Sequence, residues 1–241
     1  MTAALASITL RALLNRRRTL LLSLLGALLV LIAILYRLGN PTEAEALEVT
    51  RSLLADFGVG VLLPLVAVIV GTAALGSELD DGTIVYLLAK PVARWRIVLV
   101  KLVVAWLVTC LLVAPAIVVA GVIGHGDTQL ALGYAAASIV GALEYTAIFV
   151  ALSLITSRAL IVGLAYVVVW EGVVAGLFSG TRPVSVRQHA LAVAEALGGA
   201  GAGDAELAFG FAVAVGALVT VGAIVLAVRR LETVELRGET S

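Results

Sequence analysis

The chain has 241 residues, of which 62% are hydrophobic and only 13% are charged. An average soluble domain is nearer half apolar and a quarter charged, so this composition is that of an integral membrane protein. The formal net charge of zero gives no indication of nucleic-acid binding, and the single cysteine excludes a disulfide framework within the chain.

The first predicted element is a short amphipathic segment that precedes the first long apolar run. Residues 2–15 are too few to cross a membrane, and they mix apolar residues such as Leu5 and Ile8 with Arg11. This pattern favours a helix that lies in the membrane interface, and a frayed terminus is the alternative. The run that follows the basic triplet at residues 16–18 is long enough to stay as a span, so we expect no cleavable signal peptide.

Six apolar runs then reach the roughly 20 residues needed to cross about 30 Å of hydrocarbon. They cover residues 19–36, 57–76, 97–123, 130–156, 159–178 and 207–228. The fourth and fifth runs are separated only by Ser157 and Arg158, so we expect a tight hairpin there, because one helix of their combined length does not fit a bilayer. The sequence therefore predicts an all-α polytopic membrane protein with six transmembrane helices, which form a single domain over residues 1–241.

The distribution of basic residues orients these spans through the positive-inside rule. With a cytoplasmic N-terminus, all but four of the sixteen Lys and Arg residues fall on the cytoplasmic side; the exceptions are Arg37, Arg51, Arg182 and Arg187. Both termini are therefore expected in the cytoplasm. The composition, rich in alanine, valine and glycine, favours a GC-rich bacterial genome and hence a bacterial plasma membrane.

The longest outer segment, residues 179–206, is not uniformly polar. Within residues 186–197, Leu191, Ala194 and Leu197 recur at helical spacing and lie apart from the polar side chains. This spacing predicts a short helix between the fifth and sixth spans.

Charged residues concentrate between the second and third spans, in residues 77–101. Gly82 gives the backbone freedom for a turn, Thr83 can cap a following helix, and Pro91 ends that helix. The apolar residues between them lie mostly on one side, which predicts a short helix on the membrane surface; they are Ile84, Val85, Leu87 and Leu88. An ordinary charged loop between two spans is the alternative.

The residues around this predicted helix are acidic before it and basic after it. Glu78 precedes the helix, and Arg94 and Lys101 follow it. Acids near a helix N-terminus and bases near a C-terminus both suit the helix dipole. We expect Trp95 to lie among the lipid headgroups, and Lys101 to reach back toward them from the next span.

This segment resembles the first cytoplasmic loop of ABC-2 type transporter permeases. The resemblance rests on eight residues in a fixed order, namely Glu78, Gly82, Thr83, Leu87, Leu88, Pro91, Arg94 and Lys101. It implies that the loop holds a coupling helix that docks onto a separate ATP-hydrolysing subunit. In this docking Glu78 and Arg94 would make polar contacts, Gly82 and Pro91 would shape the turn, and the two leucines would anchor the helix.

The same resemblance implies the rest of the assembly. It predicts an exporter built from two permease subunits, alike or different, and two ATPase subunits, with an interfacial helix at the N-terminus. A pair of short helices would dip into the outer leaflet between the last two spans. The chain contains no G-x-x-x-x-G-K-[ST] motif, so ATP and Mg²⁺ would be bound by the partner ATPase, and this chain would hold no cofactor and no ATPase site of its own.

Two acids, Glu144 and Glu171, lie inside the predicted fourth and fifth spans. They are 14 and 13 residues from Arg158, so both lie about 20 Å from the cytoplasmic surface on adjacent antiparallel helices. A carboxylate in lipid must face protein or water, or be protonated. One hypothesis is that the two acids line the substrate route or a gate; the other is that each makes a structural hydrogen bond as a neutral acid.

Small residues recur at every fourth position in the fourth predicted span, and again from the fifth span into the residues that follow it. The two stripes are Gly133, Ala137 and Gly141, and Gly172, Gly176 and Gly180. Stripes of this kind let helix backbones approach closely, either within one subunit or between two.

Other functional classes fit the sequence less well. An intramembrane enzyme needs a base or a metal cluster inside the spans, whereas His125 and His189 both fall in predicted outer loops. Two histidines, one cysteine and one methionine are also a poor ligand set for a soft metal, so we expect no metal site. A channel or scaffold that works without an ATPase is the main alternative, although the spans lack the rings of charge found in many ion pores.

Overall fold

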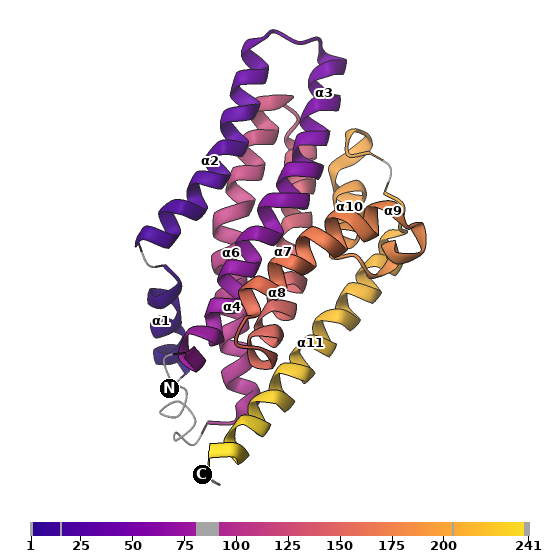
Figure 1. Cartoon of the computed structure of the whole chain (residues 1–241). Helices are drawn as coiled ribbons and strands as arrows, with labels where there is room; N and C mark the ends of the chain where they lie inside the picture. The colour runs from indigo at the N-terminus through magenta and orange to yellow at the C-terminus, as the bar shows by residue number, and fades with distance from the viewer. Residues whose placement is uncertain (1, 15, 81–91, 204, 239–241) are drawn as a thin grey trace.

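The computed structural model describes residues 2–14, 16–80, 92–203 and 205–238, and every regular element in these ranges is a helix (Figure 1). The prediction of an all-α protein is thereby confirmed. Both termini lie at the same end of the helical bundle, which is also the end where α4 finishes and α6 begins.

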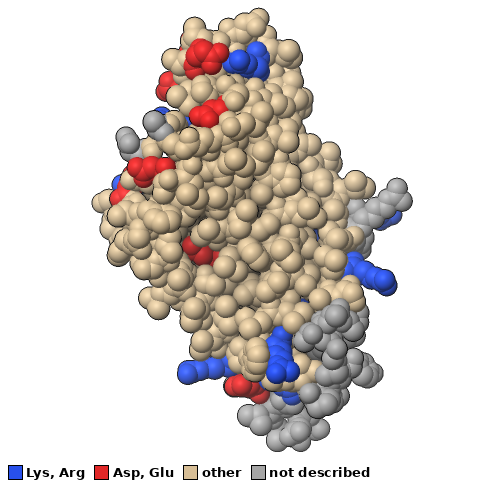
Figure 2. Space-filling view, turned by 180° about the vertical axis from the view of Figure 1, so that it is seen from behind, with Lys and Arg blue, Asp and Glu red and all other residues tan. Residues whose placement is uncertain are grey.

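Within the described residues, six helical stretches are long and apolar enough to cross a membrane, as predicted. They are α2 (Arg16–Leu38); α3, η1 and α4 (Glu43–Ser52, Leu53–Leu62 and Leu63–Asp80); α6 (Arg94–Gly124); α7 (Thr128–Ile155); α8, η2 and α9 (Ala159–Ala165, Tyr166–Val174 and Ala175–Leu177); and α11 (Phe209–Gly238). Figure 2 shows that the middle of one face is almost free of charged side chains, which lie mainly toward the two ends. This arrangement suits a belt of hydrocarbon around the bundle.

The second stretch begins fourteen residues earlier than predicted, at Glu43 instead of residue 57. Its start is fixed by a capping box, in which Glu45 N donates to Thr42 Oγ1 and Thr42 N donates to the Glu45 carboxylate. This reciprocal pair satisfies two backbone donors at the helix start, so residues 43–56, which lie between the predicted first and second spans, continue the helix. The predicted hairpin between the fourth and fifth spans is present, since α7 ends at Ile155 and α8 begins at Ala159.

The shorter helices lie at both ends of the bundle. The N-terminal helix α1 (Thr2–Leu13) packs against α6 and α4, with Leu13 buried. The helix predicted within residues 186–197 is α10 (Val186–Gly198), which is flanked by the short 3₁₀ turns η3 (Ser179–Val184) and η4 (Gly199–Gly201). In Figure 1, α10 lies beside α9, toward the opposite end of the bundle from α1.

Helix α7 is at the centre of the bundle and packs against α4, α6, α10 and α11. Two thirds of its most apolar stretch (67%) is buried, compared with 22% for α2, for α8–α9 and for α11. The three outer helices therefore expose most of their apolar surface, which in a membrane faces lipid or another subunit.

Two glycines of the first small-residue stripe explain why α7 can lie so close to its neighbours. A Cβ atom on Gly133 would lie 2.3 Å from the Gly198 Cα atom of α10, and a Cβ on Gly141 would lie 2.9 Å from Leu63 Cδ2. By contrast, no described atom lies within 4 Å of a Cβ placed on Gly176 or Gly180. The stripe on α7 therefore packs against other helices of the same chain, and the second stripe faces the surface of the chain.

This difference predicts opposite effects for two matched substitutions. Gly133→Ala should destabilise the protein by about 1–3 kcal/mol, because the added methyl group meets backbone atoms of α10 that cannot rotate away. Gly176→Ala should leave stability unchanged or raise it by up to about 1 kcal/mol, since alanine favours a helix and the site is open. Thermal unfolding in detergent checks both variants, and equal midpoints would contradict the close α7–α10 packing.

Candidate functional site

The predicted coupling segment lies only partly within the described residues. Glu78 is in the last turn of α4, Arg94 is the first residue of α6, and Lys101 lies two turns further along α6. The other residues of the pattern lie outside the described residues; they are Gly82, Thr83, Leu87, Leu88 and Pro91.

Glu78 and Lys101 form an ion pair that joins α4 to α6 at the base of the segment. The Lys101 side chain is 2% exposed and the Glu78 side chain 23%. Burying an ammonium group is costly unless a charged partner compensates it. The expectation that Lys101 reaches back to the headgroups is therefore wrong: its side chain turns inward and holds the two ends of the segment together.

The start of α6 presents a different surface. The Trp95 side chain is half exposed, and the Arg96 guanidinium carbon lies 5.1 Å from the centroid of its ring. This distance is within the range of a cation–π interaction. The exposed aromatic ring and its cation have the amphipathic character of a headgroup contact.

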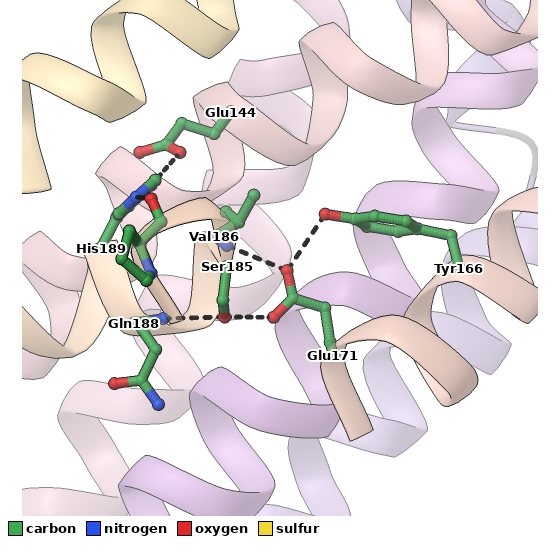
Figure 3. A network of polar contacts seen from close by, with 8 residues as sticks. Glu144, Tyr166, Glu171, Ser185, Val186, Gln188 and His189 are labelled. Atoms are coloured by element: carbon green, nitrogen blue, oxygen red, sulfur yellow. Dashed lines mark hydrogen bonds and ion pairs between the residues drawn. The ribbon is translucent and has the colours of Figure 1, made fainter. Parts of the chain in front are cut away.

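The two acids of the predicted spans are both buried, and both bind the region around the start of α10 (Figure 3). Glu171, on η2, accepts hydrogen bonds from the Val186 backbone N–H at 2.9 Å, from Ser185 Oγ at 2.5 Å and from Tyr166 Oη at 3.1 Å. Ser185 is also the N-cap of α10, since its hydroxyl oxygen accepts from Gln188 N. The carboxylate therefore lies at a helix N-terminus, where unpaired N–H groups and the helix dipole both favour negative charge.

The local backbone of η2 is what makes the Tyr166–Glu171 contact possible. These two residues are five positions apart, and residues at this spacing point in different directions in an α-helix. Residues 166–174 form a π-helix, in which the backbone hydrogen bonds run over five residues, so positions 166 and 171 lie on the same side.

The second acid, Glu144 of α7, pairs with His189 of α10. The His189 Nδ1 atom lies 2.9 Å from Glu144 Oε2, and its Nε2 atom lies 3.0 Å from the Pro183 carbonyl oxygen. Since a carbonyl oxygen only accepts, Nε2 carries a proton, and a second proton is shared between Nδ1 and the carboxylate.

Burial alone lowers the pKa of His189, but the hydrogen bond and the charge of Glu144 outweigh this effect. The Pro183 carbonyl and the charge of Glu171 act in the same direction as Glu144, so the pKa of His189 is raised above its ordinary value. Contact with Glu144 is therefore the main cause that favours the protonated form of the His189 ring.

Helix α11 leaves room for this pair through a glycine. A Cβ atom on Gly216 would lie 2.3 Å from Glu144 Oε1, so a side chain at this position would displace the Glu144 carboxylate. The carboxylate is thus enclosed by α7, α10 and α11.

Two further ion pairs join α10 and the segments that flank it to neighbouring elements. Arg187 Nη2 lies 2.5 Å from Asp56 Oδ1 on η1, and Arg182 of η3 pairs with Glu206, which lies between α10 and α11. Helix α10 is therefore tied to the bundle by both buried and partly exposed charges.

The structure brings Glu144 and Glu171 to one region, as their matching depth predicted, but their principal partners were missed. The sequence predicts His189 in an outer loop, whereas in the structure α10 packs against α7 and brings the imidazole to Glu144. The available signal was the apolar helical spacing of residues 186–197, which is unusual for a solvated loop. In the part of the chain that the structure describes, no three His, Cys, Asp or Glu side chains gather as a metal site.

Comparison with known families agrees with this architecture. A family model described as "ABC-2 family transporter protein" matches residues 14–181. The match includes the segment between α4 and α6 and both buried acids, and it ends before α10 and α11. No curated protein matches the chain. Because the family model covers most of the sequence, the chain belongs to the ABC-2 family of transporter membrane proteins.

Proposed function

We propose that the chain is the permease subunit of an ATP-driven exporter, coupled through residues 77–101 to a separate ATPase subunit. The observation that carries this proposal is the family match over residues 14–181, which includes the whole of that segment. The chain has no phosphate-binding Gly-Lys-Ser/Thr motif, so the partner would bind ATP and Mg²⁺. The complete transporter would contain two ATPase subunits and a second permease subunit, which is either the same chain or a related one.

The coupling segment would act through both docking and bracing. Arg94 would contact the ATPase, with Leu87 and Leu88 anchoring the surface helix, and Gly82, Thr83 and Pro91 would set its ends. Glu78 would have a further role, because its pairing with buried Lys101 joins α4 to α6. Displacement of the segment by the ATPase would then move both spans together.

The orientation that we propose places this segment and both termini in the cytoplasm, in a bacterial plasma membrane. It is supported by the excess of basic residues on that side and by the position of both termini at the end where α4 finishes. In this orientation α10 is on the outer side of the membrane.

The buried acids would serve as the anchor of an outer gate. Glu144 and Glu171 bind the start of α10 from two different helices, so α10 can move only together with α7 and η2 or by breaking these contacts. This role combines the two hypotheses drawn from the sequence, because a structural hydrogen bond here also controls a possible exit route.

The first test is purification of the tagged chain from its native host, with identification of the proteins that accompany it. A stoichiometric ATPase with a phosphate-binding motif is expected. Arg94→Glu should reduce its recovery by about tenfold or more, as loss of a charged contact at an interface does, while Arg96→Glu, a neighbouring exposed arginine outside the coupling pattern, should retain it. A chain that purifies alone as a stable oligomer would support the channel or scaffold alternative instead.

The bracing pair is tested by a double-mutant cycle. Glu78→Gln should lower stability by about 3 kcal/mol, because it leaves Lys101 buried without its charged partner. Lys101→Met should be less harmful, since methionine suits the apolar site, and the double variant should be more stable than Glu78→Gln alone. Unfolding midpoints in detergent measure this coupling, and strictly additive effects would show that the pair does not brace the segment.

The anchor of α10 is tested by Glu171→Gln. Loss of the charged acceptor should weaken the bonds from Ser185 and Val186 by about 2 kcal/mol, which corresponds to roughly thirtyfold more frequent opening of α10. Hydrogen–deuterium exchange of residues 186–198 in the assembled complex checks this, with Glu48→Gln, an exposed acid on α3, as the control. Unchanged exchange in Glu171→Gln would mean that the carboxylate does not hold α10.

A further inference from the structure

A cavity of about 460 Å³ lies at the cytoplasmic end of the bundle, away from both acid pairs. Its walls come from the first turn of α2, from one face of α4, and from the turn between α7 and α8. Helix α2 packs on α6 and η1, whereas α8 packs on α4 and α7, so part of α4 remains uncovered between them.

The uncovered face of α4 carries mostly small side chains. Ile69, Thr72, Ala73 and Gly76 line the cavity and recur at the spacing of one helix face. Three of the four are small, which is why the neighbouring helices leave a hollow here. The hydroxyl of Thr72 donates to the Val68 carbonyl within its own helix, so this wall offers an apolar surface.

The rim of the cavity is cationic and hydroxylated. Arg18 lines it, and no acidic side chain among the described residues pairs with the Arg18 guanidinium. Thr156 and Ser157 line the opposite side; the Thr156 hydroxyl oxygen accepts from Arg158 N and keeps its own proton to donate. The rim therefore offers donors and a positive charge that no acidic side chain of the described residues compensates.

The side of the cavity at the surface of the bundle is apolar. Leu160 and Ile155, which line it, are 44% and 46% exposed, and they lie on the surface that faces hydrocarbon in a membrane. A cavity that combines apolar walls, exposed apolar residues at its edge and an arginine at headgroup level matches the two halves of a phospholipid.

We propose that this cavity binds one anionic phospholipid of the cytoplasmic leaflet as a resident component of the permease. The headgroup phosphate would lie at Arg18 and the hydroxyls of Thr156 and Ser157, and part of an acyl chain would lie against Ile69, Ala73 and Leu160. The proposal uses the orientation given under Proposed function, but it does not depend on the identity of the ATPase or the cargo.

The test is native mass spectrometry of the purified complex after exchange into phosphatidylglycerol or phosphatidylcholine and a mild detergent wash. The wild type should retain one phosphatidylglycerol per chain and release phosphatidylcholine. Arg18→Gln should reduce retention by about fivefold, as expected for removal of one cation near an anionic headgroup. Arg17→Gln is the matched control, because Arg17 is exposed and does not line the cavity.

A second pair of variants tests the acyl-chain part. Ala73→Leu fills the cavity and should also abolish retention, whereas Ala27→Leu, on an exposed groove of α2 and α6, should not. Inorganic phosphate should fail to displace the lipid. Equal losses in Arg17→Gln and Arg18→Gln, retention by Ala73→Leu, or displacement by phosphate would each overturn the proposal.

Two separate measurements distinguish failure of this site from failure of the proposed function. Recovery of the ATPase with each variant reports on the permease assembly and should be unchanged in all four variants. Labelling of Ser157→Cys by a membrane-impermeant maleimide from the cytoplasmic side tests the orientation; labelling from outside would place the cavity in the other leaflet and contradict the proposal.

Discussion

The structure depends on one constraint: a charged group buried among apolar helices must find its partner inside the protein. Lys101, Glu144 and Glu171 all meet this condition, because each has a partner on a helix other than its own. Surfaces of leucine, valine and alanine pack in many registers with similar energy, particularly where lipid removes the hydrophobic drive between helices. The polar pairs therefore specify which helices are neighbours: α4 with α6, α7 with α10, and η2 with α10.

Helix α7 links the two ends at which these pairs lie. It packs against α4 and α6, which carry the Glu78–Lys101 ion pair, and against α10 and α11, which enclose the Glu144–His189 pair. Close contacts at Gly133 and Gly141 leave little freedom for α4 and α10 to slide along α7. Helices α4 and α6 are thus connected to α10 through one largely buried helix.

Much of this architecture could be predicted because the length of each apolar run and the positions of charged residues can be seen within short segments of the sequence. The six spans, the hairpin at Ser157–Arg158 and the helix in residues 186–197 follow from such local signals. Other features depend on contacts between distant segments: the Lys101 side chain turns inward because Glu78 meets it, and His189 is buried because α10 packs on α7. The early start of the second helix does have a local signal, the capping box formed by Thr42 and Glu45. The charged residues around it make the segment look like a loop.

The π-helix at residues 166–174 has a consequence for how this chain can vary in length. A π-helical turn holds one residue more than an α-helical turn. Deletion of one residue before Glu171 would restore the α-helical pattern of backbone hydrogen bonds. Everything beyond the deletion would then rotate by about 100° about the helix axis, which is the angle per residue of an α-helix. The Glu171 carboxylate would point away from the start of α10 and into lipid. Relatives that keep a glutamate at this position should therefore also keep the extra residue. Relatives that lack the extra residue should also lack the glutamate.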